Sequence, residues 1–208
     1  MMAETHTQLF TIGYGTHSLE SFLDALVRHG VTAVADVRSE PYSAYKPEFN
    51  REPLRNFLHS KGVAYVYLGD SLGARNMESG VVVEGRVDFD RVARSPFFQE
   101  GLNRLRQGLE KYRVALMCAE KDPMGCHRTI LICRNLRNEY DILHILADGN
   151  LESQRQLEVR LVKLFRLDQR TLPGLDDGSH TPLEEAYRKQ ARAIAYDMNA
   201  KETTESNV

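Results

Sequence analysis

The sequence predicts an α/β fold: a single three-layer domain with a mostly parallel sheet of about five strands, helices on both faces and a C-terminal helical extension. Three observations predict this fold. Short, β-prone apolar runs alternate with segments of helical spacing. The connections between the runs are long enough for right-handed crossovers. Glycines such as Gly30 and Gly62 stand where the first two helices should end.

The elements follow in order along the chain. Ser18 is a candidate N-cap for the first helix, and Pro96 suits the first turn of the third. Residues 71–95 allow either a small hairpin at 79–85 or a flexible insertion. Strands are expected over 9–12, 31–38, 63–68, 114–119 and 142–147, and helices over 19–27, 54–61, 96–109, 126–136, 151–165 and 182–199. On this basis residues 9–166 form the α/β domain, and 167–208 form a linker, a C-terminal helix and a disordered tail.

The composition excludes several classes of protein. Of the 208 residues, 42% are hydrophobic and 27% are charged, which is typical of a globular protein with a core. The net charge of −2 provides no global field toward nucleic acid or a membrane. No apolar run is long enough to span a membrane, and the N-terminus does not resemble a signal peptide. Three cysteines, an odd number, fit a reducing compartment, so a cytoplasmic location is expected.

Polar and glycine-rich sequence follows every predicted strand, at the edge where open parallel sheets bind ligands. The first strand ends in Gly13-Tyr14-Gly15-Thr16-His17, whose two glycines suggest unusual backbone angles. Asp36 and Arg38 flank a valine at the end of the second strand and should therefore share one face. A buried charge is costly without a partner. The two side chains should therefore either pair with each other or face a cleft.

The segment from Cys118 to Arg128 carries the strongest chemical signal. Cys126 begins a predicted helix, where the dipole and the neighbouring His127 and Arg128 would depress the pKa of its thiol. Arg128 suits a phosphate, sulfate or carboxylate. In the Cys-x5-Arg loop of phosphatases and rhodaneses, the arginine follows the cysteine by six residues. Here Arg128 follows Cys118 by ten residues and Cys126 by two, so neither spacing fits that loop. Cys118 could equally be a small buried hydrophobe, and Cys133 and His144 are expected in the core.

A metal site is an open alternative, although no metal ligand is assigned. Cys118, Cys126 and His127 could bind a metal ion, with a fourth ligand from His17 or an aspartate. No Cys-x2-Cys pair is present to support such a site.

Several motifs together resemble the domain-of-unknown-function 488 family. They are Thr11-Ile-Gly-Tyr-Gly-Thr-His-Ser18, Asp36-Val-Arg38, Tyr65-Val-Tyr-Leu-Gly-Asp-Ser-Leu-Gly73, Cys118-Ala-Glu-Lys-Asp-Pro-Met-Gly-Cys-His-Arg128 and His144-Ile-Leu-Ala-Asp-Gly149. The matches run in order from about residue 9 to 165. The resemblance implies that these motifs belong to one domain, but it implies no particular reaction.

Three functions compete. The first is a cysteine-dependent enzyme acting on a small anionic or nucleotide-like substrate. Its catalytic residues would be Cys126, His127, His17 and Asp36, and its substrate-binding residues Tyr14, Arg38, Tyr45, Cys118, Glu120 and Arg128. The sequence predicts neither a cofactor nor an oligomeric state, and no membrane partner is expected.

The second function is a nucleic-acid-binding or nucleic-acid-processing module, and the third is a thiol-based metal or redox sensor using Cys118 and Cys126. The second depends on a local basic rim with aromatic stacking faces. The residues that could form it are Arg38, Lys46, Arg51, Arg55, Arg75, Arg86, Arg91 and Arg94, with Tyr42, Tyr45 and Phe49.

Overall fold

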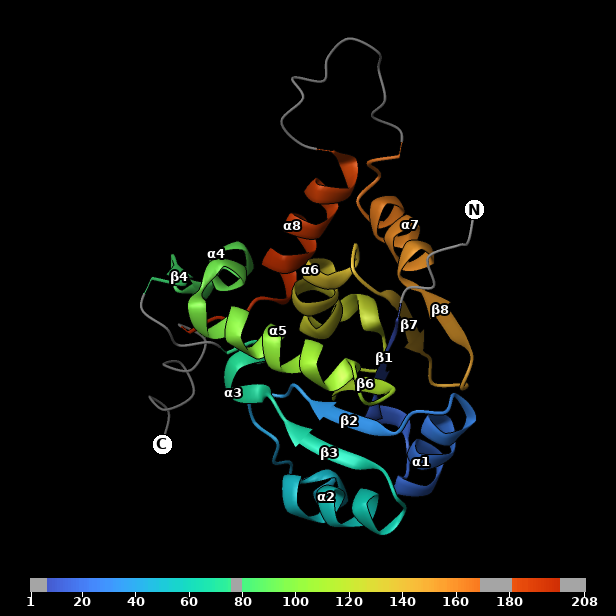
Figure 1. Ribbon diagram of the computed structural model, residues 1–208. Helices are drawn as coiled ribbons and strands as arrows, with labels where there is room; N and C mark the ends of the chain where they lie inside the picture. Colours follow the sequence, from blue (N-terminus) through green and yellow to red (C-terminus); the bar gives the residue numbers. More distant parts are fainter. Residues whose placement is uncertain (1–6, 76–79, 169–180, 199–208) are drawn as a thin grey trace.

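The computed structural model of the protein describes residues 7–75, 80–168 and 181–198 and confirms the α/β prediction (Figure 1). Its main sheet has six strands in the order β3-β2-β6-β1-β7-β8. The first five in this order are parallel, and β8 pairs antiparallel with β7. The strands are Gln8–Gly13 (β1), Ala33–Asp36 (β2), Ala64–Tyr67 (β3), Val114–Cys118 (β6), Asp141–Ile145 (β7) and Leu151–Ser153 (β8).

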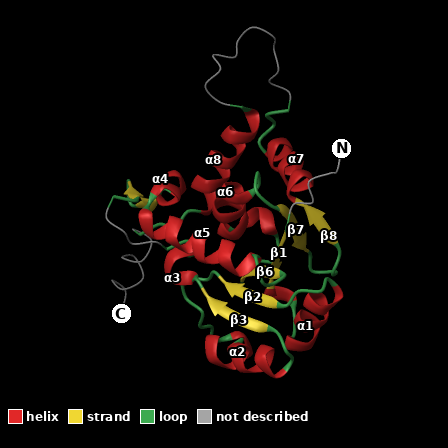
Figure 2. Ribbon diagram, viewed as in Figure 1, coloured by secondary structure: helices red, strands yellow, loops and turns green. Residues whose placement is uncertain are grey.

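Helices cover both faces of this sheet, as predicted (Figures 1 and 2). One face carries α1 (Leu19–Arg28) and α2 (Arg51–Ser60), whose core includes Phe22, Leu54 and Leu58. The other face carries α5 (Pro96–Leu109), a π-helix (Arg128–Cys133) that continues into α6 (Arg134–Leu136), and α7 (Gln154–Leu164). The helix α8 (Pro182–Ile194) packs beside α7.

The predicted helix boundaries have the expected physical causes. Ser18 accepts a hydrogen bond from the backbone N–H of Ser21 and caps α1. Gly30 and Gly62 follow α1 and α2 with φ values of +66° and +76°, which glycine adopts without steric cost. Pro96 occupies the first turn of α5, behind the N-cap Ser95.

The region between β3 and α5 contains more structure than the sequence indicated. It holds α3 (Gly69–Leu72), α4 (Phe89–Arg94) and a hairpin of β4 (Val82–Val83) and β5 (Arg86–Val87). The hairpin was one of the two alternatives for residues 79–85, and its first position, Ser79, lies outside the described residues. The helices α3 and α4 have only four and six residues, too few for a clear hydrophobic period.

Two predicted helices differ from the structure at their ends. Residues 151–153 form strand β8 instead of helix, because Asp148-Gly149 makes a tight turn that folds the chain back along β7. The last helix ends at Ile194, and Asp197 bridges to Arg86 of the hairpin. Residues 173–178 of the predicted linker and the tail from 199 lie outside the described residues. Within the described segments, no helix is both long and apolar enough to cross a membrane.

Gly13 and Gly15 are required for close approach and not for unusual angles, which corrects the sequence-based expectation. Neither has a positive φ. The backbone N–H of Gly15 donates to the carbonyl of Ala119 at 2.9 Å. A Cβ on Gly15 would lie 2.7 Å from that oxygen, and one on Gly13 would overlap the carbonyl of Glu120. The two glycines therefore let the loop after β1 lie directly against the segment after β6.

The substitution Gly13→Ala should destabilise the protein by about 1–3 kcal/mol, since the new methyl group forces two backbone segments apart. The matched control is Gly108→Ala, because a Cβ at Gly108 in α5 meets no atom of the described residues within 4 Å, apart from its chain neighbours and the backbone of its own helix. That control should gain up to about 1 kcal/mol of stability from helix propensity. Urea denaturation of both variants measures the difference, and equal stabilities would contradict the close-approach argument.

Candidate functional site

Eight of the ten predicted site residues lie at the carboxyl edge of the sheet, in two clusters on opposite faces. Gly13 pairs with Cys118, and Asp36 pairs with Met117, so β1, β2 and β6 end side by side. Cys118 and Cys126 belong to the core beneath α5 and the π-helix, whereas Tyr14 belongs to the core beneath α1 and α2. We call Cys118, Glu120, Cys126, His127 and Arg128 the thiol cluster, and Tyr14, Asp36, Arg38 and Tyr65 the ion-pair cluster.

Asp36 and Arg38 pair with each other, which was one of the two alternatives from the sequence. Arg38 donates from Nε and Nη2 to the two carboxylate oxygens of Asp36 at 2.9 and 2.6 Å. Tyr65 donates its hydroxyl to the same carboxylate at 2.7 Å. Both charged side chains are buried, with 0% and 4% exposure. Although burial alone would lower the pKa of Arg38, its hydrogen bonds and its attraction to Asp36 raise it.

Of the other residues predicted for this edge, Tyr14 and His17 are buried and Tyr45 is exposed to solvent. Tyr14 stacks on Phe49 at 4.5 Å, and the guanidinium of Arg38 lies 5.1 Å from the Tyr14 ring. His17 is buried on the same face, and its pKa is lowered by burial and by the charge of Lys46. Tyr45 is 97% exposed, so its ring does not share this buried environment. Asp36 and His17 therefore lie on the other face of the sheet from Cys126. A common catalytic set would require all three side chains to share one face.

The thiol cluster brings two sulfur atoms, a carboxylate and an imidazole together (all from the Cys118–Arg128 segment). The Cys118 and Cys126 thiols both donate to Glu120 Oε2, at 2.9 and 3.1 Å. His127 Nδ1 lies 3.7 Å from each of the two sulfurs. Cys118, Cys126 and His127 are 4%, 1% and 7% exposed. The cluster is therefore closed to large molecules. Its polar atoms contact one another inside the protein.

A hydrogen bond from Nε2 fixes the orientation of the His127 ring. Nε2 lies 2.9 Å from the carbonyl oxygen of Val37, which can only accept, so Nε2 carries a hydrogen. Although burial alone would lower the pKa of His127, the charge of Cys126 and its hydrogen bond raise it, which favours a proton on Nδ1. Where a cation displaces that proton, the Nδ1 lone pair faces both sulfurs. The backbone of β2 thus fixes a nitrogen ligand atom on the opposite side of the strand from the ion-pair cluster.

The ionisation of the cluster is strongly perturbed. Burial would raise the pKa of Cys126, but the hydrogen bond with Cys118 and the charges of Arg128 and His127 hold that pKa well below its ordinary value. The hydrogen bond with Cys126 and burial raise the pKa of Cys118. Burial also raises the pKa of the Glu120 carboxyl. The two thiols are therefore chemically unequal despite their similar contacts.

The local sequence builds this cluster in a short distance. Asp122 caps the turn Pro123–Gly125 by accepting from the backbone N–H of Met124 at 3.0 Å. The carbonyl of Cys126 then accepts from Thr129 and Ile130, so a helical segment begins directly after Cys126, as predicted. Its first turns form a π-helix and not the expected α-helix. Such widened turns are frequent at functional sites.

Arg128 connects the cluster to the sheet. It is fully buried, and its Nη1 donates to the carbonyl of Glu120 at 2.6 Å while Nε contacts Thr11 Oγ1 at 3.4 Å. Its Nη2 has no hydrogen-bond partner within the described part of the chain, and the same holds for Nη1 of Arg38. Thr11 is a contact that sequence reasoning missed; its one signal was a polar side chain inside an apolar strand.

Three ligand atoms of the thiol cluster could hold a metal ion. Those of Cys118, Cys126 and His127 all lie within 4.8 Å of one another. Neither His17 nor an aspartate, the fourth ligands considered from the sequence, belongs to this group. Glu120 contacts the sulfurs but is also outside it, which leaves three protein donors.

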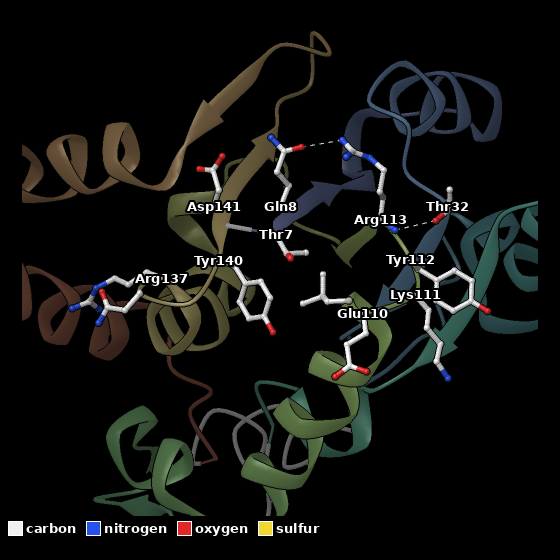
Figure 3. A pocket seen from close by; sticks show the side chains of 12 residues that line it. Thr7, Gln8, Thr32, Glu110, Lys111, Tyr112, Arg113, Arg137, Tyr140 and Asp141 are labelled. Carbon is white, nitrogen blue, oxygen red and sulfur yellow. Dashed lines mark hydrogen bonds between the residues drawn. The ribbon is translucent and has the colours of Figure 1, made fainter. Parts of the chain in front are cut away.

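A broad, open depression lies at the other edge of the sheet, around the amino ends of β1, β6 and β7 (Figure 3). Its lining includes Gln8, Arg113, Tyr140 and Asp141, and Arg113 donates to Gln8 there. None of the residues predicted for the functional site lines it. Its position therefore gives no reason to move the candidate site away from the thiol cluster.

A family model described as "Domain of unknown function DUF488" matches residues 18–134, more than half of the chain. The chain belongs to this family. The DUF488 match contains the Asp36–Arg38 pair and the whole thiol cluster, whereas Thr11, Tyr14, His17 and all residues from β7 to α8 lie outside it. No curated protein and no solved structure matches the chain.

Proposed function

We propose that Cys118, Cys126 and His127 bind a soft divalent metal ion, best suited to Zn²⁺, and that this centre acts on a small anionic substrate. The convergence of three ligand atoms within 4.8 Å carries the proposal. Tetrahedral zinc has Zn–S and Zn–N bonds of about 2.3 and 2.0–2.1 Å, which places sulfur and nitrogen roughly 3.6 Å apart. The 3.7 Å separations around His127 Nδ1 fit that value.

Two further features suit a cation. The Nε2–H of His127 donates to the backbone carbonyl of Val37, and a bond of this kind usually orients a metal-binding histidine. With His127 neutral, as a metal ligand must be, two thiolates and the Glu120 carboxylate set against the single Arg128 guanidinium leave two negative charges in a buried space. A divalent ion would neutralise them, whereas without it protons must do so.

Three protein ligands leave a fourth position, which is the pattern of catalytic and not structural zinc sites. A metal ion held there would supply a Lewis acid or an activated water molecule. Glu120, which contacts both sulfurs, is placed to accept protons. The unpartnered Nη2 of Arg128 offers a buried donor to an anionic group. Because the ligands must be reduced thiols, we also propose the cytoplasm as the location.

A thiolate nucleophile at Cys126 is the second candidate. The position of Cys126 at the start of a helical segment, beside His127 and Arg128, favours it. Its 1% exposure counts against attack on any but the smallest substrate. Binding of a metal ion itself requires no access for a substrate-sized molecule, and for this reason we place metal binding first.

The nucleic-acid hypothesis gains less from the structure. Arg38 is buried against Asp36, and Arg75 and Arg86 form ion pairs with Glu40 and Asp197. These three arginines are therefore partly neutralised, which weakens the proposed basic rim.

Protein purified without chelators should contain about one zinc ion per chain by elemental mass spectrometry, because a buried site of two thiolates and an imidazole binds it tightly. Less than about 0.1 metal ion per chain, with none taken up on adding Zn²⁺, would contradict the metal centre. If Cys126 of that metal-free protein also reacted with iodoacetamide at neutral pH much faster than the buried Cys133, a thiolate nucleophile at Cys126 would become the preferred function in place of the metal centre.

A further inference from the structure

We propose that α8, which lies outside the DUF488 match, is part of the functional centre, and that Tyr187 and Gln190 are positioning residues for the thiol cluster. They act through Arg128 and through the loop between Cys118 and Cys126. The effect on metal binding rests on the proposed function, but the effect on the loop does not.

The first connection is a continuous series of hydrogen bonds, all of them buried except the last, which is partly buried. Arg128 Nε contacts Thr11 Oγ1 at 3.4 Å, and Thr11 Oγ1 contacts His144 Nδ1 at 2.9 Å. The series continues from His144 Nε2 to Gln154 Oε1 at 2.9 Å and from Gln154 Nε2 to Tyr187 at 2.6 Å. It ends where the Tyr187 hydroxyl meets Glu158 Oε1 at 2.8 Å. We call this series the Arg128–Glu158 network.

Every donor in this network points the same way. The Arg128 guanidinium can only donate, and the Glu158 carboxylate can only accept. Tyr187 donates to Glu158, so its oxygen accepts from the Gln154 amide nitrogen, and the Gln154 oxygen accepts from His144 Nε2. His144 Nδ1 then accepts from the Thr11 hydroxyl, whose oxygen accepts from Arg128. Each step fixes the next, so the network has one consistent arrangement.

His144 keeps this arrangement at neutral pH. Burial, followed by the charge of Arg128, lowers the pKa of His144 to about 3. The ring is therefore neutral and retains the acceptor nitrogen that Thr11 requires. The histidine predicted from the sequence as a satisfied core residue is thus also the middle member of the network.

The second connection is direct. Gln190 Nε2 donates to the backbone carbonyl of Met124 at 2.9 Å, inside the loop that joins the two cysteines. The helix itself is anchored by Glu184, which accepts from Arg134 at 2.6 Å and from Arg137 at 2.5 Å. Both arginines also lie 5.2 Å from the Tyr187 ring. Thus α8 holds the loop at Met124 and, through Arg128, at the carbonyl of Glu120.

This inference is tested with two variants and one control. Tyr187→Phe removes the hydroxyl but keeps the ring, and Gln190→Leu removes the bond to Met124. Lys189→Ala is the control, because Lys189 lies on the same helix with 40% exposure. Hydrogen exchange of peptides covering 119–130 is measured on metal-free protein, and zinc affinity is measured by chelator competition. Thermal unfolding monitors the global fold.

Both variants should exchange faster across 119–130 than the wild type and the control, with smaller changes in α1 and α2. The zinc Kd should rise by about 2–5-fold, less than the roughly 10-fold or more that follows loss of a group bonded directly to a ligand, because Tyr187 and Gln190 contact none of the three ligands. Exchange and Kd equal to the control would overturn the inference. If one variant fails to fold, the other decides. If the wild type binds no zinc, the proposed function fails, and the exchange result still judges the role of α8.

Discussion

Replacing Cys126 with alanine should abolish stoichiometric zinc binding. The loss in affinity should exceed the roughly 10–100-fold that follows removal of an outer-shell partner, since a direct ligand is lost. Cys118→Ala and His127→Ala should each cause a similar loss, because each removes one of the three converging ligand atoms. Isothermal titration with Zn²⁺ under reducing conditions measures the three affinities.

Cys133→Ala is the matched control for this loss. Cys133 is equally buried and ends the π-helix that begins two residues after Cys126, but its sulfur is not among the converging ligand atoms. It should retain one zinc ion per chain with close to wild-type affinity. Full zinc binding by Cys126→Ala, or equal loss in Cys133→Ala, would contradict the assignment of the ligands.

The substitution Asp36→Asn should destabilise the fold by about 3–5 kcal/mol, the usual cost of leaving one member of a buried ion pair without its partner. Arg38 has only 4% exposure and cannot move its charge into water without opening the carboxyl edge. Tyr65 would also exchange a charged acceptor for a neutral one. Chemical denaturation at neutral pH measures the change.

Glu139→Gln provides the control for that prediction. Glu139 forms a bidentate ion pair with Arg106, similar in geometry to the pair of Asp36 and Arg38. The side chain of Glu139, however, is 42% exposed. Its loss should cost no more than about 1 kcal/mol, because water replaces the partner. A cost for Asp36→Asn as small as that of the control would show that burial does not set the value of the Asp36–Arg38 pair.

Much of the fold could be predicted because its elements carry a clear local pattern. The five parallel strands are apolar runs, and helices α1, α2 and α5 have marked caps or stops. Strand β8 was missed because three residues are too short to show alternation. Its signal was the Asp148-Gly149 turn, which predicts a hairpin as readily as the end of a strand.

The candidate site was predictable only where it is local in sequence. The thiol cluster spans 11 residues, and the Asp36–Arg38 pair spans three, so alternation and helix starts were enough to place their members near one another. The face of the sheet that each cluster occupies depends on pairing between strands, which one sequence does not reveal. Contacts such as that of Thr11 with His144, 133 positions apart, lie beyond any local pattern.

The central claim is that two cysteines and one histidine hold a metal ion at the carboxyl edge of the sheet. X-ray absorption at the zinc edge of the purified protein tests it most directly. We predict a shell with two sulfurs at about 2.3 Å and nitrogen or oxygen neighbours at about 2.0–2.2 Å. A shell of oxygen and nitrogen alone, or one of four sulfurs, would contradict the claim.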